Sequence, residues 1–413
     1  MLLLKVYLLF GVYTFVTSAK YDGYKVYEVN LQNQPQADFL YQLSHQNGID
    51  GLHIPRTINN SAHIMVSPRR QCEFEKTLAR YSLNYDVIIS DIEKFWGEQG
   101  RTVVGPRKSN ENGIRFTRYY RHSEINEYLE LLARKYPNTV SVYTVGKSYE
   151  GRAIKVIRIN NGQHLPNKKV IFIDAGIHAR EWIAPATALY IIYQLVENME
   201  ANRQLLDKYD WIILPLVNPD GYEYSHTNDR MWRKTRSKNF ICYGTDANRN
   251  FGYHWGEVGA SYNPCSDIYR GSKAFSEPET KTVRDILLSL KGTGVFYLSL
   301  HSYGNYILYP WGWTRKLPEN HEILHEIAAA GADAIRNATG SRYTCGSSTR
   351  VLYSAAGGSD DYAYGTAGFP VTFTMELPPG GSGFDPPPSK IQSFTQEAWI
   401  GIKAMAKKVA EKY

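Results

Sequence analysis

The stretch IFIDAGIHAREWIAP, residues 171–185, places three ionisable side chains directly after an apolar run. His178, Arg180 and Glu181 bring an imidazole, a guanidinium and a carboxylate into one turn. A neutral imidazole and a carboxylate with the spacing H-x-x-E can bind the same metal ion. A third ligand must come from elsewhere, and His301 in SLHSYG is the natural candidate. Two histidines and one glutamate leave one position of a zinc ion open for water, which is typical of a catalytic site.

A second candidate metal motif is HEILHE at residues 321–326, which matches the H-E-x-x-H pattern of zinc-binding helices. The apolar residues around it recur at helical spacing, and both histidines fall at the edge of that stripe. A zinc site of this kind needs both histidines facing a closed interior and a third ligand. After Glu326 no glutamate occurs until Glu376, which ends a predicted strand. We therefore interpret this motif as part of an amphipathic surface helix.

Strands and helices alternate through residues 114–413, the larger of two predicted domains. The predicted strands, all largely apolar, are 169–177, 210–218, 295–302 and 370–377. The helices predicted between and after them are 184–199, 277–290, 318–337 and 390–412. Apolar strands separated by helices indicate an α/β fold with a mixed, largely parallel twisted sheet flanked by helices.

Three of these strands end in residues that can do chemistry. His178, His301 and Glu376 each lie where one predicted strand stops. In folds of this class, ligands bind outside the carboxyl ends of the strands. Three strands that deliver ionisable groups to the same sheet edge therefore predict one functional site there.

The N-terminal part of the chain contains three segments of different composition. Residues 1–19 are nearly all apolar and end in small residues, which predicts a secretory signal peptide cut after Ala19. Residues 20–96 alternate short strands and helices, which predicts a small α+β pro-domain. Residues 97–113 are glycine-rich and polar, which predicts an exposed linker that a trypsin-like protease would cut near residues 107–108. An ordinary interdomain linker is the alternative, but the order of the segments favours a secreted zymogen.

Composition excludes several other classes of protein. Hydrophobic residues make up 43% and charged residues 21%, as in ordinary globular proteins. The net charge of +7 is mild, and without a block of Lys and Arg we expect no binding to nucleic acid. Beyond the N-terminal segment no run approaches 18 apolar residues, so we expect a soluble extracellular monomer and no membrane span. Asn59 and Asn337 lie in N-x-[ST] patterns and are candidate glycan sites.

Four cysteines allow three complete pairings. Secretion would permit disulfides to form. Cys242 and Cys265 bracket a loop-rich segment and are the best local pair. Cys72 and Cys345 lie far apart in the sequence, and we expect both to be free and buried.

Seven motifs occur in an order that resembles the secreted zinc carboxypeptidases of the pancreatic A/B type: HAREW, NPDGY, MWRKTRS, DANRNF, HSYG, AAGGSDD and FTMEL. The resemblance covers essentially the whole chain and implies a carboxypeptidase-like fold, with peptide and protein C-termini as substrates and the pro-domain as inhibitor. It implies that His178, Glu181 and His301 bind one Zn²⁺ ion, since carboxypeptidase A is known for a His₂Glu site. Glu376 would be the general base that activates the attacking water.

The resemblance also assigns residues to the substrate. Arg236 in KTRS would stabilise the oxyanion on the scissile carbonyl, although its run of basic residues alone would indicate a solvated face. Asn248 and Arg249 in DANRN would bind the terminal carboxylate, the arginine through two hydrogen bonds. Such a pair at a fixed distance from zinc can accept only the last residue of a chain. Tyr353 would close over that residue, and the other residues assigned to the peptide are Arg180, Ser302 and Tyr303.

Asp360 in AAGGSDD bears on which terminal residue is removed. At this position the family carries an apolar residue in A-type enzymes and an aspartate at the base of the specificity pocket in B-type enzymes. A buried carboxylate there would favour a terminal Lys or Arg over Leu or Phe. The alternative is that Asp360 turns outward to water and that specificity is A-type. Asp361 resembles a structural acid of both types, while residues 378–379 replace an Arg-Asp pair common in vertebrate members by two prolines.

Two other functions are compatible with parts of the sequence. The first is a zinc hydrolase that uses His321 and His325, which would then lose its zinc when His321, rather than His178, is replaced. The second is a catalytically inactive protein that binds C-terminal peptides on the same scaffold. The complete ligand set and the intact Glu376 argue against the second.

Overall fold

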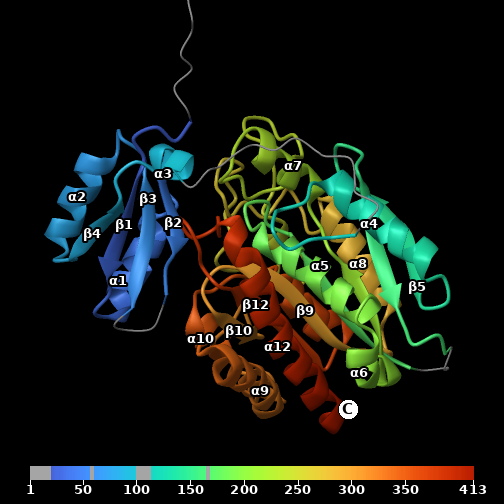
Figure 1. Ribbon diagram of the computed structural model, residues 1–413. Coiled ribbons are helices and arrows are strands. Elements are labelled where there is room, and N and C mark those ends of the chain that lie inside the picture. Colours follow the sequence, from blue (N-terminus) through green and yellow to red (C-terminus); the bar gives the residue numbers. More distant parts are fainter. Residues whose placement is uncertain (1–19, 56–59, 99–112, 164–167) are drawn as a thin grey trace, which may run out of the picture.

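The computed structural model describes residues 20–55, 60–98, 113–163 and 168–413 (Figure 1). The predicted signal peptide, the glycan motif at Asn59 and the predicted cleavage site at residues 107–108 lie outside these ranges. Within them, none of the helices combines the length and the apolar character that are needed to cross a bilayer.

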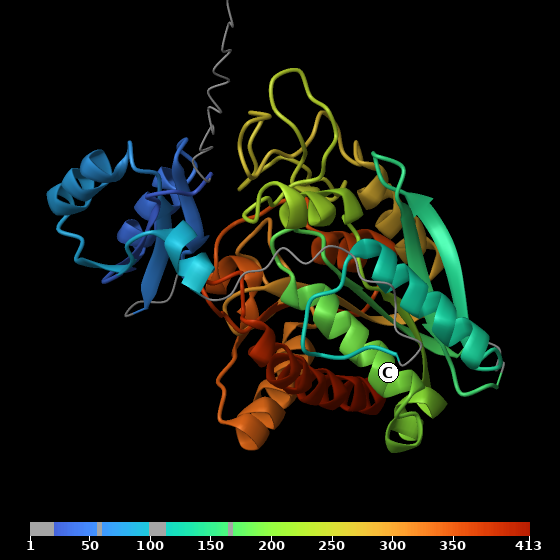
Figure 2. The ribbon, with the colours of Figure 1, turned by 45° about the horizontal axis from the view of Figure 1, so that its top comes forward.

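The N-terminal domain (residues 20–98) is a small α+β unit beside the larger C-terminal domain (residues 113–413) (Figures 1 and 2). Its four strands form an antiparallel sheet in the order β2-β3-β1-β4. The strands are β1 (Lys25–Asn30), β2 (Ile49–His53), β3 (Ser61–Val66) and β4 (Tyr85–Ile89). The helices are α1 (Gln34–Leu43), α2 (Gln71–Arg80) and α3 (Ile92–Glu98). The α+β class predicted for this segment is therefore confirmed.

Apolar residues on both faces of this small sheet are buried. Tyr27 and Val29 of β1 pack in one core with residues of α1 and α2. Val26 of the same strand points the other way, because successive side chains of a strand alternate between faces. It lies in a second core that includes Tyr303 and Phe384 of the C-terminal domain. The C-terminal domain thus serves as the second layer of the small sheet.

The C-terminal domain is built on an eight-stranded mixed sheet in the order β11-β10-β12-β9-β7-β8-β6-β5. The central strands β8, β7, β9 and β12 are neighbours in the sheet and pair in parallel. The pairs β5–β6, β6–β8 and β10–β12 are antiparallel. The strands are β5 (Val140–Lys147), β6 (Ala153–Ile159), β7 (Lys169–Ala175), β8 (Tyr209–Leu214), β9 (Gly294–Ser302), β10 (Tyr306–Tyr309), β11 (Thr344–Ser347) and β12 (Val371–Leu377). The predicted fold class, a mixed and largely parallel sheet flanked by helices, is confirmed.

Helices cover both faces of this sheet, so its central strands are apolar throughout. Ile171 and Ile173 of β7 pack in one core with α5 and α12, while Phe172 between them packs in the opposite core with α8. Figure 1 shows α5 and α12 on one side of the sheet and α8 on the other. The longer helices are α4 (His122–Lys135), α5 (Ile183–Val196), α7 (Pro219–Thr227), α8 (Pro278–Ser289), α9 (His321–Thr339) and α12 (Pro388–Lys412). Short helices are α6 (Arg203–Lys208), α10 (Ser348–Val351) and α11 (Ser359–Tyr362).

The HEILHE motif lies in the first turns of α9, which is an amphipathic helix at the surface. Leu324, Ile327 and Ile335 are buried against the sheet and α12, whereas His325 is exposed. Glu326 forms ion pairs with Lys408 and Lys412 of α12, at 3.0 and 2.7 Å. This polar face is therefore used for contacts between two helices at the surface, as the sequence indicated.

Glu279, in the first turn of α8, is a fully buried carboxyl group. Its Oε1 accepts a hydrogen bond from the Tyr149 N–H at 3.0 Å, while Oε2 finds no hydrogen-bond partner in the described part of the chain. Burial raises the pKa of this carboxyl group from 4.5 to about 8. The folded protein therefore holds a proton here that the unfolded chain loses at a lower pH.

We expect the contribution of Glu279 to the free energy of unfolding to fall between pH 5 and pH 8, and Glu279→Gln to remove that dependence. The stabilisation by the neutral carboxyl is complete below pH 4.5 and is lost as the pH rises through about 8. In thermal unfolding of the zinc-loaded proteins, the free energy of unfolding of wild type relative to Glu279→Gln should fall by on the order of 2–4 kcal/mol over this range. Glu322→Gln, at an exposed position of α9, is the matched control. Identical pH profiles for wild type and Glu279→Gln would contradict the expectation.

Candidate metal centre and cleft

Neighbouring strands bring His178, His301 and Glu376 to one edge of the large sheet. Strand β7 pairs in parallel with β9 as far as Ala175 and Leu300, so the chain leaves both strands side by side. Strand β9 pairs in parallel with β12, and Glu376 lies directly opposite His301. Because parallel strands end in the same direction, all three side chains meet at their carboxyl ends.

The turn that carries His178 depends on Gly176, which has a positive φ of 67°. A Cβ atom at this position would lie 2.7 Å from Leu216 and 2.9 Å from Pro185, so the turn has no room for a larger residue. The chain reverses here and enters α5 at Ile183. This places His178 and Glu181 in one loop between the strand and the helix.

The side chains of His178, Glu181 and His301 converge on one point. The His178 Nδ1 lies 2.8 Å from Glu181 Oε1, and the His301 Nδ1 lies 3.1 Å from Glu181 Oε2. The two Nδ1 atoms are 3.2 Å apart. Ligand atoms of a tetrahedral zinc ion with bonds of about 2.1 Å are separated by about 3.4 Å, so these distances fit such a site. All three residues are buried, and one ligand atom from each lies within 4.8 Å of the other two.

The electrostatics of this group reflect close opposite charges in a buried place. Burial alone would raise the pKa of Glu181, but His178 and His301 hold it well below its usual range. Burial alone would lower the pKa of His301, but the Glu181 carboxylate raises it. A cation bound between these side chains would compensate the carboxylate without requiring protonated imidazoles, as metal ligands must be deprotonated.

Asp246 lies behind the group and connects it to the rest of the site. Its Oδ1 lies 3.0 Å from His178 Nε2, and its Oδ2 accepts hydrogen bonds from the Arg233 guanidinium at 3.1 and 2.9 Å. Burial alone would raise the pKa of Asp246, but Arg233 and His178 hold it well below its usual range. A carboxylate on the outer nitrogen of a ligating imidazole fixes the ring and its tautomer.

Glu376 faces the same point from β12. Its Oε2 is buried and, among the described residues, has no hydrogen-bond partner. Burial raises the pKa of this carboxyl group, with a further contribution from Glu181 that His301 opposes. A carboxylate whose pKa is raised toward neutrality can both accept and return a proton, so the arrangement suits general acid–base chemistry.

The structure corrects the prediction for Arg236, which does not face the metal group. Its guanidinium lies over the rings of Tyr224 and Trp232, 3.7 and 4.5 Å from their centroids. The arginine that faces the group is Arg233, three residues earlier, whose Nη1 lies 4.0 Å from Glu181 Oε1. The contacts of each side chain determine which arginine faces the metal group: Arg236 packs on aromatic rings, and Arg233 bonds to the Asp246 carboxylate. The sequence pattern missed both Arg233 and Asp246, although Asp246 begins the DANRN motif.

Asn248 and Arg249 lie on a short turn (Ala247–Arg249) at the wall of the cleft. The backbone N–H of Asn248 donates to Asp246 Oδ1 at 2.9 Å, and its side-chain oxygen accepts from the Ser359 N–H at 3.0 Å. The Arg249 guanidinium donates to the Gly259 carbonyl oxygen at 2.9 Å. These bonds fix an amide and a guanidinium beside the metal group.

Asp360, which is buried, lines the cleft together with Gly312, Ser348 and Thr374. Burial raises the pKa of Asp360, while hydrogen bonds from the backbone and from Thr374 oppose the shift. Its neighbour Asp361 instead accepts hydrogen bonds from the backbone N–H groups of Gly312 and Trp313. The alternative that Asp360 turns outward to water is therefore excluded.

The N-terminal domain closes the cleft from outside. The Arg180 guanidinium donates to Asp50 of β2 at 2.7 Å. Tyr353 stacks on Tyr41 of α1, with ring centroids 4.8 Å apart. The space left between the two domains measures about 740 Å³ and is also lined by Ser302 and Tyr303. The predicted peptide-contact residues thus surround one cleft, which the N-terminal domain covers.

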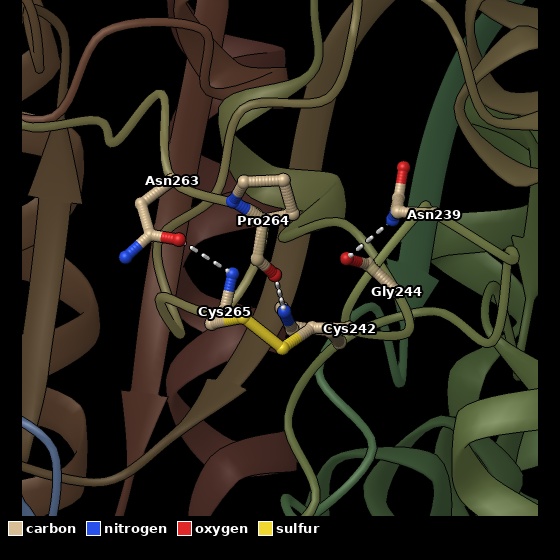
Figure 3. The surroundings of a disulfide bond; sticks show 7 residues. Asn239, Cys242, Gly244, Asn263, Pro264 and Cys265 are labelled. Carbon is tan, nitrogen blue, oxygen red and sulfur yellow. Dashed lines mark hydrogen bonds between the residues drawn. A yellow bond between two sulfur atoms is a disulfide. The ribbon is translucent and has the colours of Figure 1, made fainter.

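A disulfide between Cys242 and Cys265 fixes one wall of the cleft (Figure 3). The predicted pairing is therefore confirmed. Within the bridged segment the Asn263 side chain accepts from the Cys265 N–H at 3.0 Å. Residues of segment 263–268, which contains the second cysteine, contribute directly to the lining of the cleft.

The other two cysteines are free, as expected, but the prediction that both are buried is wrong. Cys72 is exposed, because α2 buries Phe74 and Leu78 on its other side. Cys345 is half-buried on β11. Asn337 is exposed on α9, and its glycosylation stays a prediction.

Comparisons with known proteins agree over both domains. Residues 125–401 match the family described as zinc carboxypeptidase, and residues 27–99 match the carboxypeptidase activation peptide. The chain is 40% identical over 409 residues to carboxypeptidase B of Helicoverpa zea, covering 95% of each protein. It is 38% identical over 421 residues to zinc carboxypeptidase A 1 of Drosophila melanogaster, covering 97% of each. The crystal structure of carboxypeptidase A from Helicoverpa armigera superposes with a TM-score of 0.89 at 32% identity, covering 95% of this chain and 99% of that one.

We expect His301→Ala to lose bound zinc, because only two of three converging protein ligands would remain. His325→Ala, which changes the exposed histidine of α9, should retain one zinc ion per chain. The metal content of both variants after dialysis, measured by elemental analysis, checks the assignment. Zinc loss from His325→Ala with retention in His301→Ala would contradict it and favour the HEILHE motif.

Proposed function

The chain belongs to the zinc carboxypeptidase family, and from this premise we propose that it releases C-terminal Lys or Arg from peptides and proteins. Its A/B-type membership and its activation peptide make it a zymogen. The observation that carries the choice of Lys or Arg is the buried carboxylate of Asp360 in the lining of the cleft. An ionised carboxylate in such a place is costly unless a cation pairs with it. The relatives include proteins named carboxypeptidase A and carboxypeptidase B, so release of aliphatic or aromatic residues, the A-type specificity, is the alternative.

The terminal carboxylate of the substrate is recognised beside the metal group. Arg249 and the Asn248 side chain offer N–H donors, and Arg180 also lines the cleft. A guanidinium and an amide suit a carboxylate, because several hydrogen bonds can form at once. With Asp360 also in the lining, the cleft would then offer one place for a cationic side chain and a separate place for the carboxylate. This arrangement accepts the last residue of a chain and excludes an internal one.

In the proposed mechanism, His178, Glu181 and His301 hold Zn²⁺, the cofactor of this family. When bound, zinc supplies Lewis-acid polarisation of the scissile carbonyl group and activates water for attack. Glu376 accepts a proton from the attacking water and delivers it to the leaving amine. Arg233, fixed by Asp246, donates hydrogen bonds to the oxyanion that develops on the carbonyl. Asp246 thus positions the oxyanion donor and one zinc ligand at the same time.

The N-terminal domain is the inhibitory segment of the zymogen. Its Asp50 carboxylate occupies Arg180, and its Tyr41 ring covers Tyr353, so both groups are withheld from substrate. We further propose that the protein is secreted after removal of residues 1–19 and acts as a monomer. A trypsin-like protease would activate it within the linker at residues 97–113, which separates the domains predicted at 20–96 and 114–413.

We expect Arg233→Ala to lower kcat of the trypsin-activated enzyme by about 10²–10³-fold, because a preorganised oxyanion donor is lost. Arg236→Ala should keep kcat within about threefold, since this guanidinium packs on aromatic rings away from the cleft. Steady-state kinetics with one peptide substrate measures both variants, and circular dichroism checks that each is folded. The reverse order of effects would favour Arg236 as the oxyanion donor.

The specificity assay tests the proposed function directly. After trypsin treatment, the enzyme should release Arg from a peptide ending in Arg far faster than Leu from a matched peptide ending in Leu. Asp360→Asn should lower kcat/KM for the Arg peptide by about 30- to 1000-fold, because a buried charge pair loses one partner. The same variant should change kcat/KM for the Leu peptide by less than about tenfold. Faster release of Leu than of Arg by the wild-type enzyme would overturn the proposal and favour A-type specificity.

A further inference from the structure

The three histidines in the described part of the N-terminal domain all lie toward the C-terminal domain. His53, the last residue of β2, stacks with Tyr303 and Tyr306, with ring centroids 5.5 and 5.8 Å apart. The His53 Nε2 lies 3.4 Å from the Tyr306 hydroxyl oxygen. His63 on β3 has its Nδ1 3.3 Å from the Tyr303 hydroxyl oxygen, and His45 lines the cleft. Imidazoles therefore form part of the contact that closes the cleft.

The surroundings of His53 are poorly suited to a positive charge. The titratable group that faces it within its own sheet is His63, whose ring centroid lies 6.1 Å away and which would repel it if both were protonated. From the C-terminal domain it is faced by the neutral rings of Tyr303 and Tyr306. The remaining charged groups around this contact are Glu28, 3.6 Å from His63, Arg180 with its partner Asp50, and Glu376 beyond Tyr306.

Docking therefore favours the uncharged imidazole. Burial, with a smaller contribution from His63, lowers the pKa of His53 from 6.5 to about 4. Burial lowers the pKa of His63 as well, although Glu28 opposes the shift. When the domains separate, the imidazoles return to water and to an ordinary pKa. By linkage, lowering the pH below about 6.5 then favours the separated state, which binds more protons.

We propose that His53 is a pH-sensitive latch between the two domains. Neutral His53 holds the N-terminal domain over the cleft through Tyr303 and Tyr306, and protonation releases it. After the linker has been cut, the severed domain stays docked near neutral pH and dissociates in acid. The effect of this latch on activity rests on the proposed function, because the cleft that opens is the proposed active site. The latch itself is a property of the contact between the domains.

The test measures association rather than catalysis. The full chain is cut within the linker by limited trypsin treatment, and analytical ultracentrifugation gives the Kd of the two fragments at pH 7.5 and pH 5.0. Titration of His53 alone predicts a Kd about 30-fold higher at pH 5.0. His53→Phe keeps a flat ring but cannot be protonated, so it should lower the ratio of the two Kd values by about 30-fold. His53→Gln, also neutral, should do the same even if the fragments bind more weakly at both pH values.

His325→Phe, at an exposed position of α9, is the matched control and should keep the wild-type ratio. A wild-type Kd that is equal at both pH values, or an unchanged ratio in both neutral His53 variants, would overturn the latch. Release of Arg from a peptide by the separated catalytic fragment is measured in parallel at pH 7.5. Absence of that activity would overturn the proposed function, whereas the latch is decided by the Kd ratios alone.

Discussion

The buried carboxylate of Asp246 is the constraint on which the rest of the site depends. It bonds to the imidazole of His178, the guanidinium of Arg233 and the backbone N–H of Asn248. An isolated carboxylate with no exposure to solvent would be strongly destabilising, and these donors together compensate it. One anion therefore sets the relative positions of a candidate metal ligand, the proposed oxyanion donor and the turn that is proposed to bind the substrate carboxylate. Removing it would take away the hydrogen-bond acceptor of the buried Arg233 guanidinium and loosen three parts of the site together.

A second constraint is the parallel register of β7, β9 and β12. The ligand from β7 and the ligand from β9 meet because both strands end in the same direction, and Glu376 lies beside them because it pairs with His301.

The small sheet of the N-terminal domain shows how inhibition is linked to folding. Val26 is buried beside Tyr303 and Phe384 of the C-terminal domain, so part of the core of the inhibitory domain belongs to its contact with the enzyme. Separating the domains exposes this surface, and that cost opposes release.

Most of the metal site could be predicted from sequence because local patterns encode it. Apolar runs such as 169–177 mark strands buried on both faces, and their ends mark one sheet edge. The strands β5, β6, β10 and β11 were not predicted; β5 is half exposed, and β10 and β11 have only four residues each. The choice between Arg233 and Arg236 could not be predicted, because both lie in one basic run and distant partners separate them. The exposure of Cys72 depends likewise on which face α2 buries.

The adjacent carboxylates of Asp360 and Asp361 show how the proposed specificity arises from uneven compensation. Both are buried, and the charge of Asp360 raises the pKa of Asp361 further. Asp361 is compensated within the protein by the N–H groups of Gly312 and Trp313. Gly312 is itself required here, because a Cβ would lie 2.7 Å from the Ala355 carbonyl oxygen. Asp360 has hydrogen bonds from the backbone and from Thr374, but it also borders the cleft, where a cationic side chain of the proposed substrate would add compensation. The proposed selectivity for Lys or Arg would then come from relief of an unfavourable buried charge, an effect that an apolar side chain cannot provide.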